Sequence, residues 1–235
     1  MAADLLQVKG VLFDLGGTLD GDGEHWLNRF FALYRTHLPR VSFEDLKAAF
    51  YEAEAACLAE PGVAGMGLDG LVAFHVRRQL KALKVDAPDV AVKLSEAFVA
   101  SCRHYFRRNA GLLARLARRF RLGVITNWYG SARRLLTEEG LAPALLAVVD
   151  SKEAGVRKPD PGIFRLALQK LGMPPEEVAY VGDSYGQDIR PAKAVGLITV
   201  WLRNDAMAAP LPPDFDPTVA DYQIRALPEL EALLS

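Results

Sequence analysis

Short apolar runs recur along this chain, each the right length for one buried strand, and most of them end in a polar residue. They are VKGVLFDL (8–15), LGVIT (122–126), LLAVVD (145–150), VAYVGD (178–183) and LITVWL (197–202). Beyond residue 107, segments with helical spacing of apolar residues separate these runs. Buried strands that alternate with helices predict a parallel sheet covered on both faces. TVADY (218–222) is a weaker strand candidate, and PLPPDFDP (210–217) is expected to loop over the sheet edge.

The stretch between the first and second runs has a different pattern. Apolar residues there recur every three or four positions, as in amphipathic helices. Pro88 is expected to open one of these helices, and a separate helix is expected at about 110–120. We therefore predict a Rossmann-like α/β core made of residues 1–20 and 107–235, interrupted by an all-helical cap subdomain at 21–106.

Composition and charge narrow the possible functions. The 235 residues include 28 Lys and Arg against 29 Asp and Glu, so no global basic field would attract nucleic acid or an acidic membrane surface. Cys57 and Cys102 are the only cysteines, and neither belongs to a CxxC motif or a Cys/His cluster. We expect neither structural zinc nor a disulfide framework, and a reducing cytoplasm fits best. No apolar run reaches membrane-spanning length.

Polar side chains gather where the predicted strands end and in the loops that follow. They are Asp14, Thr126, Asn127, Lys158, Asp183 and Asp188. The carboxyl ends of parallel strands share one edge of a sheet, and ligands of such sheets bind beyond that edge. We therefore expect these six side chains to lie close together.

Such a cluster suits phosphoryl transfer. Asp14 and Asp183 cannot both stay charged at close range without a counterion, and Mg²⁺ would supply one through oxygen ligands. Lys158 could hold Asp14 ionised and bind a phosphate oxygen. Thr126 precedes a helix expected to begin near Ser131, so its hydroxyl and the adjacent amides could bind an anion. A carboxylate, a metal, a lysine and a hydroxyl around one point fit a reaction through an aspartyl intermediate.

The order and spacing of FDLGGTL, the strand end at Thr126, GVRKPDPGIF and VGDSYGQD resemble the motifs of the haloacid dehalogenase-like hydrolases. The resemblance covers nearly the whole chain, and the helical insertion resembles the type-one cap of that family. It implies an Mg²⁺-dependent hydrolase, most often a phosphatase of a small phosphorylated metabolite. We expect no nucleic acid or membrane partner, and a monomer or a homodimer.

The resemblance also implies roles for individual residues. The metal ligands would be Asp14, Gly16 (through its backbone carbonyl), Asp183 and Asp188, the last by ordering metal-bound water or Lys158. Asp14 would also be the nucleophile, and Thr126 and Lys158 would be catalytic groups that hold the phosphoryl group.

Further candidates would bind the substrate. Asn127 stands beside Thr126, and His25 and Trp26 open the predicted cap near the mouth of the site. Trp128, followed by Tyr129, could form an aromatic wall, although each of these rings could equally pack beneath the cap.

Gly16 is the main departure from the family pattern. Phosphatases of the family usually carry a second Asp at this position, which serves as general acid and base. One explanation is that an acid of the following loop, Asp20, Asp22 or Glu24, replaces it. Another is chemistry that needs no such proton, as with acyl phosphates or in 2-haloacid dehalogenation, although dehalogenases of the family need no metal and the intact GDSYGQD argues against them. The third is a catalytically weak protein that binds a phosphometabolite or a partner.

Overall fold

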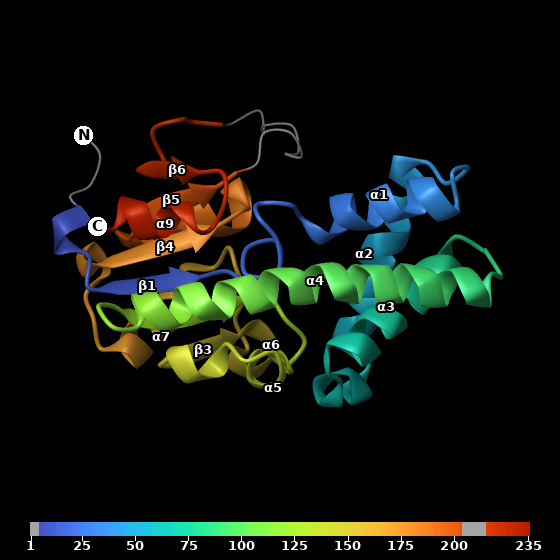
Figure 1. The fold of residues 1–235 in the computed structure, drawn as a ribbon, viewed down its shortest axis with the longest axis horizontal. Helices are drawn as coiled ribbons and strands as arrows, with labels where there is room; N and C mark the ends of the chain where they lie inside the picture. Colours follow the sequence, from blue (N-terminus) through green and yellow to red (C-terminus); the bar gives the residue numbers. More distant parts are fainter. Residues whose placement is uncertain (1–4, 204–214) are drawn as a thin grey trace.

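A six-stranded sheet organises the computed structural model, which describes residues 5–203 and 215–235 (Figure 1). Its strands are β1 (Gly10–Phe13), β2 (Arg121–Thr126), β3 (Ala147–Asp150), β4 (Val178–Gly182), β5 (Ile198–Leu202) and β6 (Tyr222–Ile224). They lie in the order β3-β2-β1-β4-β5-β6, and every neighbouring pair is parallel. The predicted parallel α/β core is therefore confirmed.

The last strand lies later than the sequence predicts, at Tyr222–Ile224 instead of 218–222. Side chains explain the shift, because the preceding residues bind the start of β5 without a backbone ladder. The Thr199 hydroxyl donates to the carbonyl of Val219 at 2.9 Å, and Asp221 accepts from the backbone N–H of Thr199 at 2.9 Å. The predicted loop at 210–217 lies mostly outside the described residues.

Helices cover both faces of the sheet, as the alternation of apolar runs and helical segments predicts. They are α1 (Trp26–His37), α2 (Phe43–Ala59), α3 (Leu68–Ala82), α4 (Pro88–Leu116), α5 (Ala132–Glu138), α6 (Ser151–Ala154), α7 (Pro161–Leu171), α8 (Arg190–Val195) and α9 (Glu229–Leu233). Alternate residues of β1 point to opposite faces. Leu12 packs in the cluster formed with α7 and α8, whereas Val11 and Phe13 pack with α4, α5 and α9.

Helices α1 to α4 form the inserted region after β1, and they extend beyond the carboxyl ends of the strands (Figure 1). One unbroken helix, α4, connects this region to the core, whereas the sequence predicts two separate helices at Pro88 and at 110–120. Its buried side chains continue at helical spacing from Leu94 to Leu116, so nothing interrupts the helix. The helix passes through residue 107, and the boundary placed there stays a prediction.

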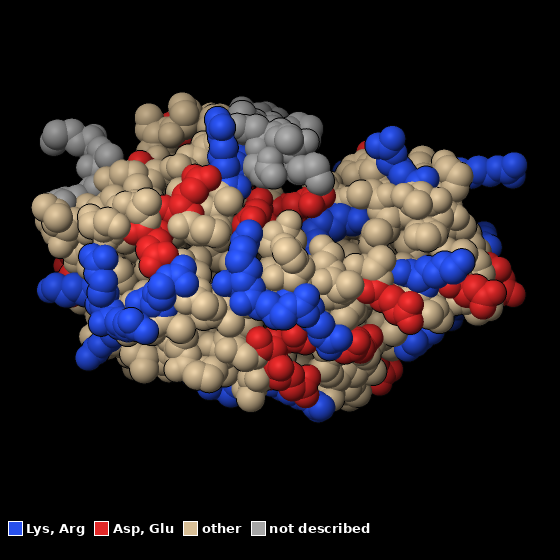
Figure 2. Space-filling view, in the orientation of Figure 1, with Lys and Arg blue, Asp and Glu red and all other residues tan. Residues whose placement is uncertain are grey.

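The surface carries no field of one sign on the face shown in Figure 2, where basic and acidic side chains are interspersed. This agrees with the net charge of −1. Among the helices of the described segments, none has the length and apolarity that a membrane span requires.

Candidate active site

Two glycines allow the loops at the sheet edge to approach closely. Gly17 has a φ of +89°, and a Cβ built on it would lie 2.6 Å from Asp183 Oδ2. A Cβ on Gly182 would lie 2.6 Å from the Cβ of Asp188. Because glycine has no side chain at these two positions, the loops can approach closely enough for oxygens of Asp14, Asp183 and Asp188 to lie within 4.8 Å of one another. The predicted convergence of these three carboxylates is observed.

Lys158 lies between two of these carboxylates and is 3% exposed. Its Nζ donates to Asp14 Oδ1 at 2.5 Å and to Asp188 Oδ1 at 2.6 Å. The backbone of Lys158 is held by Asn127, which accepts from its N–H at 2.8 Å and donates to its carbonyl at 3.0 Å. Asn127 therefore positions the lysine in this structure.

Asp188 is anchored by the protein. It lies on a π-helical turn, Tyr185–Ile189, directly after β4. Its Oδ1 also accepts from the hydroxyl of Tyr180 at 2.8 Å, and its Oδ2 accepts from the N–H of Ser184 at 3.0 Å. With both oxygens engaged, Asp188 is well placed to orient Lys158.

The electrostatics of the cluster favour a divalent cation. Burial raises the pKa of Asp14 to about 7, although Lys158 opposes the shift. Burial, together with the charges of Asp14 and Asp188, raises the pKa of Asp183 well above its ordinary range. Three carboxylates face a single interposed lysine, so a hard cation with a preference for oxygen ligands fits this donor set.

Thr126 ends β2 and is 2% exposed. It lines the same cavity as Asp14, and its hydroxyl makes no hydrogen bond with a described residue, so it remains available to a ligand. The helix expected near Ser131 begins at Ala132. The N–H groups of Gly130 and Ala132 donate to Asp150 Oδ2 at 2.8 and 3.1 Å, so these two amides are engaged by the protein, and the anion site expected at Thr126 and the amides beside it stays a prediction.

A cavity of about 220 Å³ lies between the sheet edge and the inserted helices. The site residues predicted from the sequence all line it: Asp14, Gly16, His25, Trp26, Thr126, Asn127, Trp128, Lys158, Asp183 and Asp188. The His25 Nδ1 accepts from the N–H of Leu27 at 3.2 Å and caps α1, so this ring has a local structural role as well.

Tyr129, expected beside Trp128 as part of an aromatic wall, also lines the cavity. Sequence reasoning missed other residues of the lining, which are Phe50, Tyr51, Glu54, Arg157, Ser184 and Gln187. Glu54 lies four residues after Phe50 on α2, at the edge of the apolar stripe that α2 buries. Because acids border the apolar stripe of most amphipathic helices, this position gives no signal in the sequence that distinguishes Glu54 from the other acids of α2.

Two tryptophans occupy the space above Gly16. The rings of Trp26 and Trp128 cross at 86°, with centroids 5.4 Å apart. A Cβ on Gly16 would lie 3.6 Å from Trp128 and 3.7 Å from Trp26 Nε1, which is ordinary contact. A methyl group therefore fits at residue 16, whereas a longer side chain would meet the indole rings.

Two acids of the loop after β1 are engaged elsewhere. Asp20 is fully buried and accepts from the N–H of Gly17 at 2.6 Å and from Trp26 Nε1 at 2.5 Å. Asp22 pairs with both terminal nitrogens of Arg108 at 2.5 and 2.7 Å. Neither carboxylate is free to replace the missing one at residue 16, and the expectation that Asp20 or Asp22 serves as a mobile acid is not supported by this geometry.

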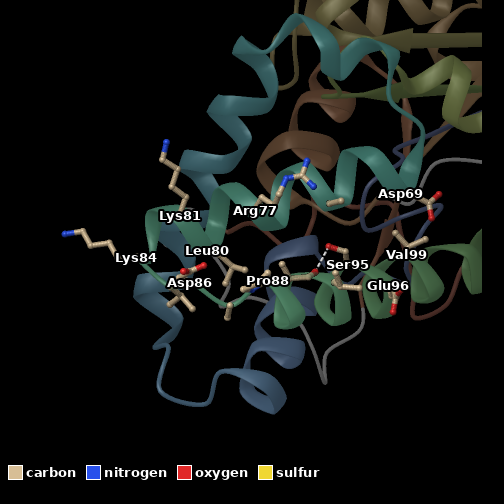
Figure 3. A pocket seen from close by; sticks show the side chains of 15 residues that line it. Asp69, Arg77, Leu80, Lys81, Lys84, Asp86, Pro88, Ser95, Glu96 and Val99 are labelled. Carbon is tan, nitrogen blue, oxygen red and sulfur yellow. Dashed lines mark hydrogen bonds between the residues drawn. The ribbon is translucent and has the colours of Figure 1, made fainter.

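A larger cavity, of about 840 Å³, lies between α3 and α4 at the far end of the inserted region (Figure 3). Its lining includes Leu80, Val85, Pro88 and Val99, with Lys81 and Glu96 among the charged side chains around it. None of the clustered carboxylates belongs to its lining among the described residues. The smaller cavity is therefore the candidate active site.

Comparison with known proteins agrees with this geometry. A family model described as haloacid dehalogenase-like hydrolase matches residues 8–196. The chain belongs to the haloacid dehalogenase-like hydrolase family. The inserted helical region after β1 is consistent with the cap of that family.

Several relatives are phosphatases. The phosphoglycolate phosphatase of Rhodospirillum rubrum is 43% identical over 208 residues, which cover 83% of this chain and 79% of that protein. The phosphoserine phosphatase of Thermus thermophilus is 36% identical over 151 residues, or 63% of this chain, and the chain spans only 60% of that relative. The HAD-hydrolase YfnB from Bacillus subtilis, solved bound to magnesium, has the same fold at 22% identity, with a TM-score of 0.59 over 97% of this chain and 99% of that one.

Proposed function

We propose that this protein is an Mg²⁺-dependent phosphatase that acts on a small phosphorylated metabolite through an aspartyl-phosphate intermediate. One observation carries the proposal: Lys158 Nζ lies 2.5 Å from Asp14 and 2.6 Å from Asp188, within a cluster of three carboxylates. The phosphatase relatives support the reaction class, and the small cavity supports a compact substrate.

The residues divide the reaction between them. Asp14 would attack phosphorus, the bond from phosphorus to the leaving oxygen would break, and water would then hydrolyse the aspartyl phosphate. Lys158 and the Thr126 hydroxyl would hold the phosphoryl oxygens. Asp14, Asp183 and the Gly16 carbonyl would hold Mg²⁺, with Asp188 in support. When bound, the metal offsets the negative charge of the carboxylates and the phosphoryl group.

The inserted helices would act as a type-one cap that closes over the cavity, excludes bulk water and selects the substrate. His25 and Trp26 would contact the leaving group from this side, and Trp128 from the side of the sheet. Their shared place in the lining supports these roles.

Gly16 favours a second candidate, 2-haloacid dehalogenation, in which Asp14 attacks carbon and a halide leaves without a proton. The two reactions differ in their need for metal.

The decisive experiment is a hydrolysis screen with Mg²⁺ and with EDTA, using p-nitrophenyl phosphate, acetyl phosphate, a panel of phosphomonoesters and 2-chloropropionate. Phosphate release that EDTA abolishes supports the proposal. Halide release that survives EDTA favours the second candidate, and phosphate binding without turnover favours a binding protein.

A further inference from the structure

Aromatic rings and a carboxylate outside the cluster of Asp14, Asp183 and Asp188 line the same cavity. The rings are those of Trp26, Phe50, Tyr51, Trp128 and Tyr129, and the carboxylate is Glu54. Trp26 and Trp128 meet at a right-angled corner, and Tyr129 continues the wall 5.4 Å from Trp128. The faces of aromatic rings attract cations, and cages of such rings are the usual binding sites of alkylated ammonium groups.

Glu54 gives this wall a negative charge. Its Oε1 accepts hydrogen bonds from the Tyr129 hydroxyl and, at 3.0 Å, from His75 Nε2. Burial acts to raise the pKa of Glu54, but the hydrogen bonds from His75 and Tyr129, together with the charges of His75 and His25, outweigh it and the pKa is lowered, so the carboxylate is ionised at neutral pH. Its Oε2 makes no hydrogen bond with any described residue, which leaves one oxygen of an ionised carboxylate for a ligand.

The carboxylate is also held in position. His75 is fully buried, and Gln79 Nε2 lies 2.7 Å from its Nδ1, which directs the other ring nitrogen toward Glu54. Phe30 stacks on the His75 ring, with a centroid distance of 5.6 Å and an interplanar angle of 8°. A chain of buried partners that fixes one accessible carboxylate is what a preorganised binding site requires.

Contacts between neighbouring side chains connect the aromatic wall from Trp26 through Trp128 and Tyr129 to Glu54. At one end, Trp26 and Trp128 contact the space above Gly16, two residues from Asp14. At the other end, Tyr129 donates to Glu54. The cavity volume of about 220 Å³ leaves room only for a compact substrate between them.

We propose that the leaving alcohol of the substrate carries an ammonium group, which Glu54 and the aromatic rings bind while the phosphoryl group lies against Asp14. This inference rests on the proposed function and adds the substrate class to it. The bond from Asp14 to phosphorus forms, the bond from phosphorus to the alcohol oxygen breaks, and the amino alcohol leaves after its oxygen takes a proton from water. The positive charge of the ammonium group stabilises the developing alkoxide, which matters in a site that lacks a carboxyl group at residue 16.

The first test compares substrates of equal shape and different charge. Phosphocholine and its neutral isostere 3,3-dimethylbutyl phosphate differ only in the replacement of nitrogen by carbon. With Mg²⁺ present, we expect kcat/KM to be roughly 10- to 30-fold higher for phosphocholine. Phosphoglycolate, whose leaving group is an anion, should be hydrolysed more slowly than either. Equal values for the isosteric pair, or a preference for phosphoglycolate through the exposed Arg157 of the lining, would overturn the inference.

The second test assigns the preference to Glu54. Glu54→Gln keeps the shape of the side chain and its acceptor oxygen but removes the charge, and we expect the ratio for the isosteric pair to fall by roughly 5- to 10-fold, mainly through KM for phosphocholine. The two leaving groups differ in intrinsic reactivity, and this difference is the same in every variant. A change in the ratio of the two kcat/KM values therefore comes from the protein. Glu52→Gln is the matched control, because Glu52 is an exposed acid on the same helix. An unchanged ratio in a folded Glu54→Gln protein would contradict the assignment.

A binding measurement separates this inference from the proposed function. Choline should change the fluorescence of Trp26 and Trp128 in the wild type with a Kd at least 5-fold below that in Glu54→Gln, whereas 3,3-dimethylbutanol should have little effect. If no phosphate ester is hydrolysed, p-nitrophenyl phosphate included, the proposed function fails and the inferred substrate class fails with it, whether or not choline binds. If neutral esters are hydrolysed and choline does not bind, the inference fails and the proposed function stands.

Discussion

The two walls of the cavity are built differently. The wall at the sheet edge consists of interlocked polar groups at strand ends, where Asp14, Lys158 and Asp188 are between 1 and 5% exposed. The opposite wall comes from α1 and α2, and it is more open, with Tyr51 55% exposed and the Glu54 side chain 27% exposed. Short strands of a parallel sheet fix side chains at hydrogen-bond distances, whereas helices joined to the sheet by few connections can shift relative to it. This difference supports a division of labour within the proposed function, with reaction chemistry at the sheet wall and substrate selection at the helical wall.

The largest expected effect is at the sheet wall. Asp14→Asn should lower kcat roughly 10⁴- to 10⁶-fold for every substrate, because an amide is a poor nucleophile and removal of a nucleophile typically costs this much. Steady-state assays on protein shown by mass spectrometry to be free of deamidation measure the effect. A variant that keeps wild-type rates would remove the covalent mechanism and, with it, the assignment of chemistry to this wall.

Lys158→Ala should affect both catalysis and stability. It leaves Asp14 and Asp188 buried without their cation, and breaking a buried ion pair in this way costs about 3–5 kcal/mol of the free energy of unfolding. We expect kcat/KM to fall on the order of 10²–10³-fold, as for other groups that stabilise the transferring charge. Urea unfolding and phosphatase assays measure the two effects. Mg²⁺ should restore part of the stability and little of the activity, and full recovery of activity would show that the lysine acts only as a counterion.

Gly16 lies where the two walls meet, so a substitution at this residue tests whether a change at the sheet wall also affects the helical wall. Gly16→Asp should raise kcat for alkyl phosphates more than for aryl or acyl phosphates, with a ceiling of ~10²–10⁴ typical of general acid and base catalysis. The indole rings of Trp26 and Trp128 occupy the space that the carboxylate needs, so we expect a gain near the lower limit.

The matched control is Gly16→Ala, whose Cβ fits at ordinary contact distance and should leave activity within about threefold. If alkyl and aryl phosphates respond equally to Gly16→Asp, the leaving-group argument is wrong. Glu24→Gln is then the direct test of the remaining acid of this loop, since Asp20 and Asp22 are engaged by Trp26 and Arg108.

The same contrast explains what could be predicted from the sequence. The strands and the convergence at their ends follow from local signals, since most of the apolar runs have a polar residue at or near their end, as in FDLGG and VGDSYGQD. The sheet wall was therefore accessible without a structure. The position of the last strand could not be predicted in this way. It depends on hydrogen bonds between Thr199 and Asp221, which lie far apart in the sequence.

The helical wall was harder to predict for a physical reason. A helix presents a different residue every 100°, so which side chains face the cavity depends on how the helices pack and not on a motif. Glu54 enters the site through hydrogen bonds to His75 and Tyr129, which lie 21 and 75 residues away. Likewise, the engagement of Asp20 by Trp26 becomes visible only when the loop after β1 is seen folded beneath α1.

The smallest expected effect concerns the metal, which should act on the sheet wall alone. Burial raises the pKa of Asp14 from 3.8 to about 7 and raises that of Asp183. A carboxyl group whose pKa is raised on folding favours the folded state at low pH, and this contribution is lost as the pH rises from about 4 through 7. Metal-free protein should therefore lose stability over this range, and Mg²⁺ should stabilise it more at pH 8 than at pH 5, because the ligands are ionised only at the higher pH.

At 100 times its Kd, Mg²⁺ should contribute about 2.7 kcal/mol to the free energy of unfolding, which corresponds to roughly 5–10 °C in Tm. Thermal melts with and without Mg²⁺ at the two pH values measure this difference. Asp183→Asn should abolish the Mg²⁺-dependent shift, whereas Glu54→Gln, on the helical wall, should leave it within about 1 °C. A shift that is equal at both pH values, or that persists in Asp183→Asn, would place the metal away from these carboxylates.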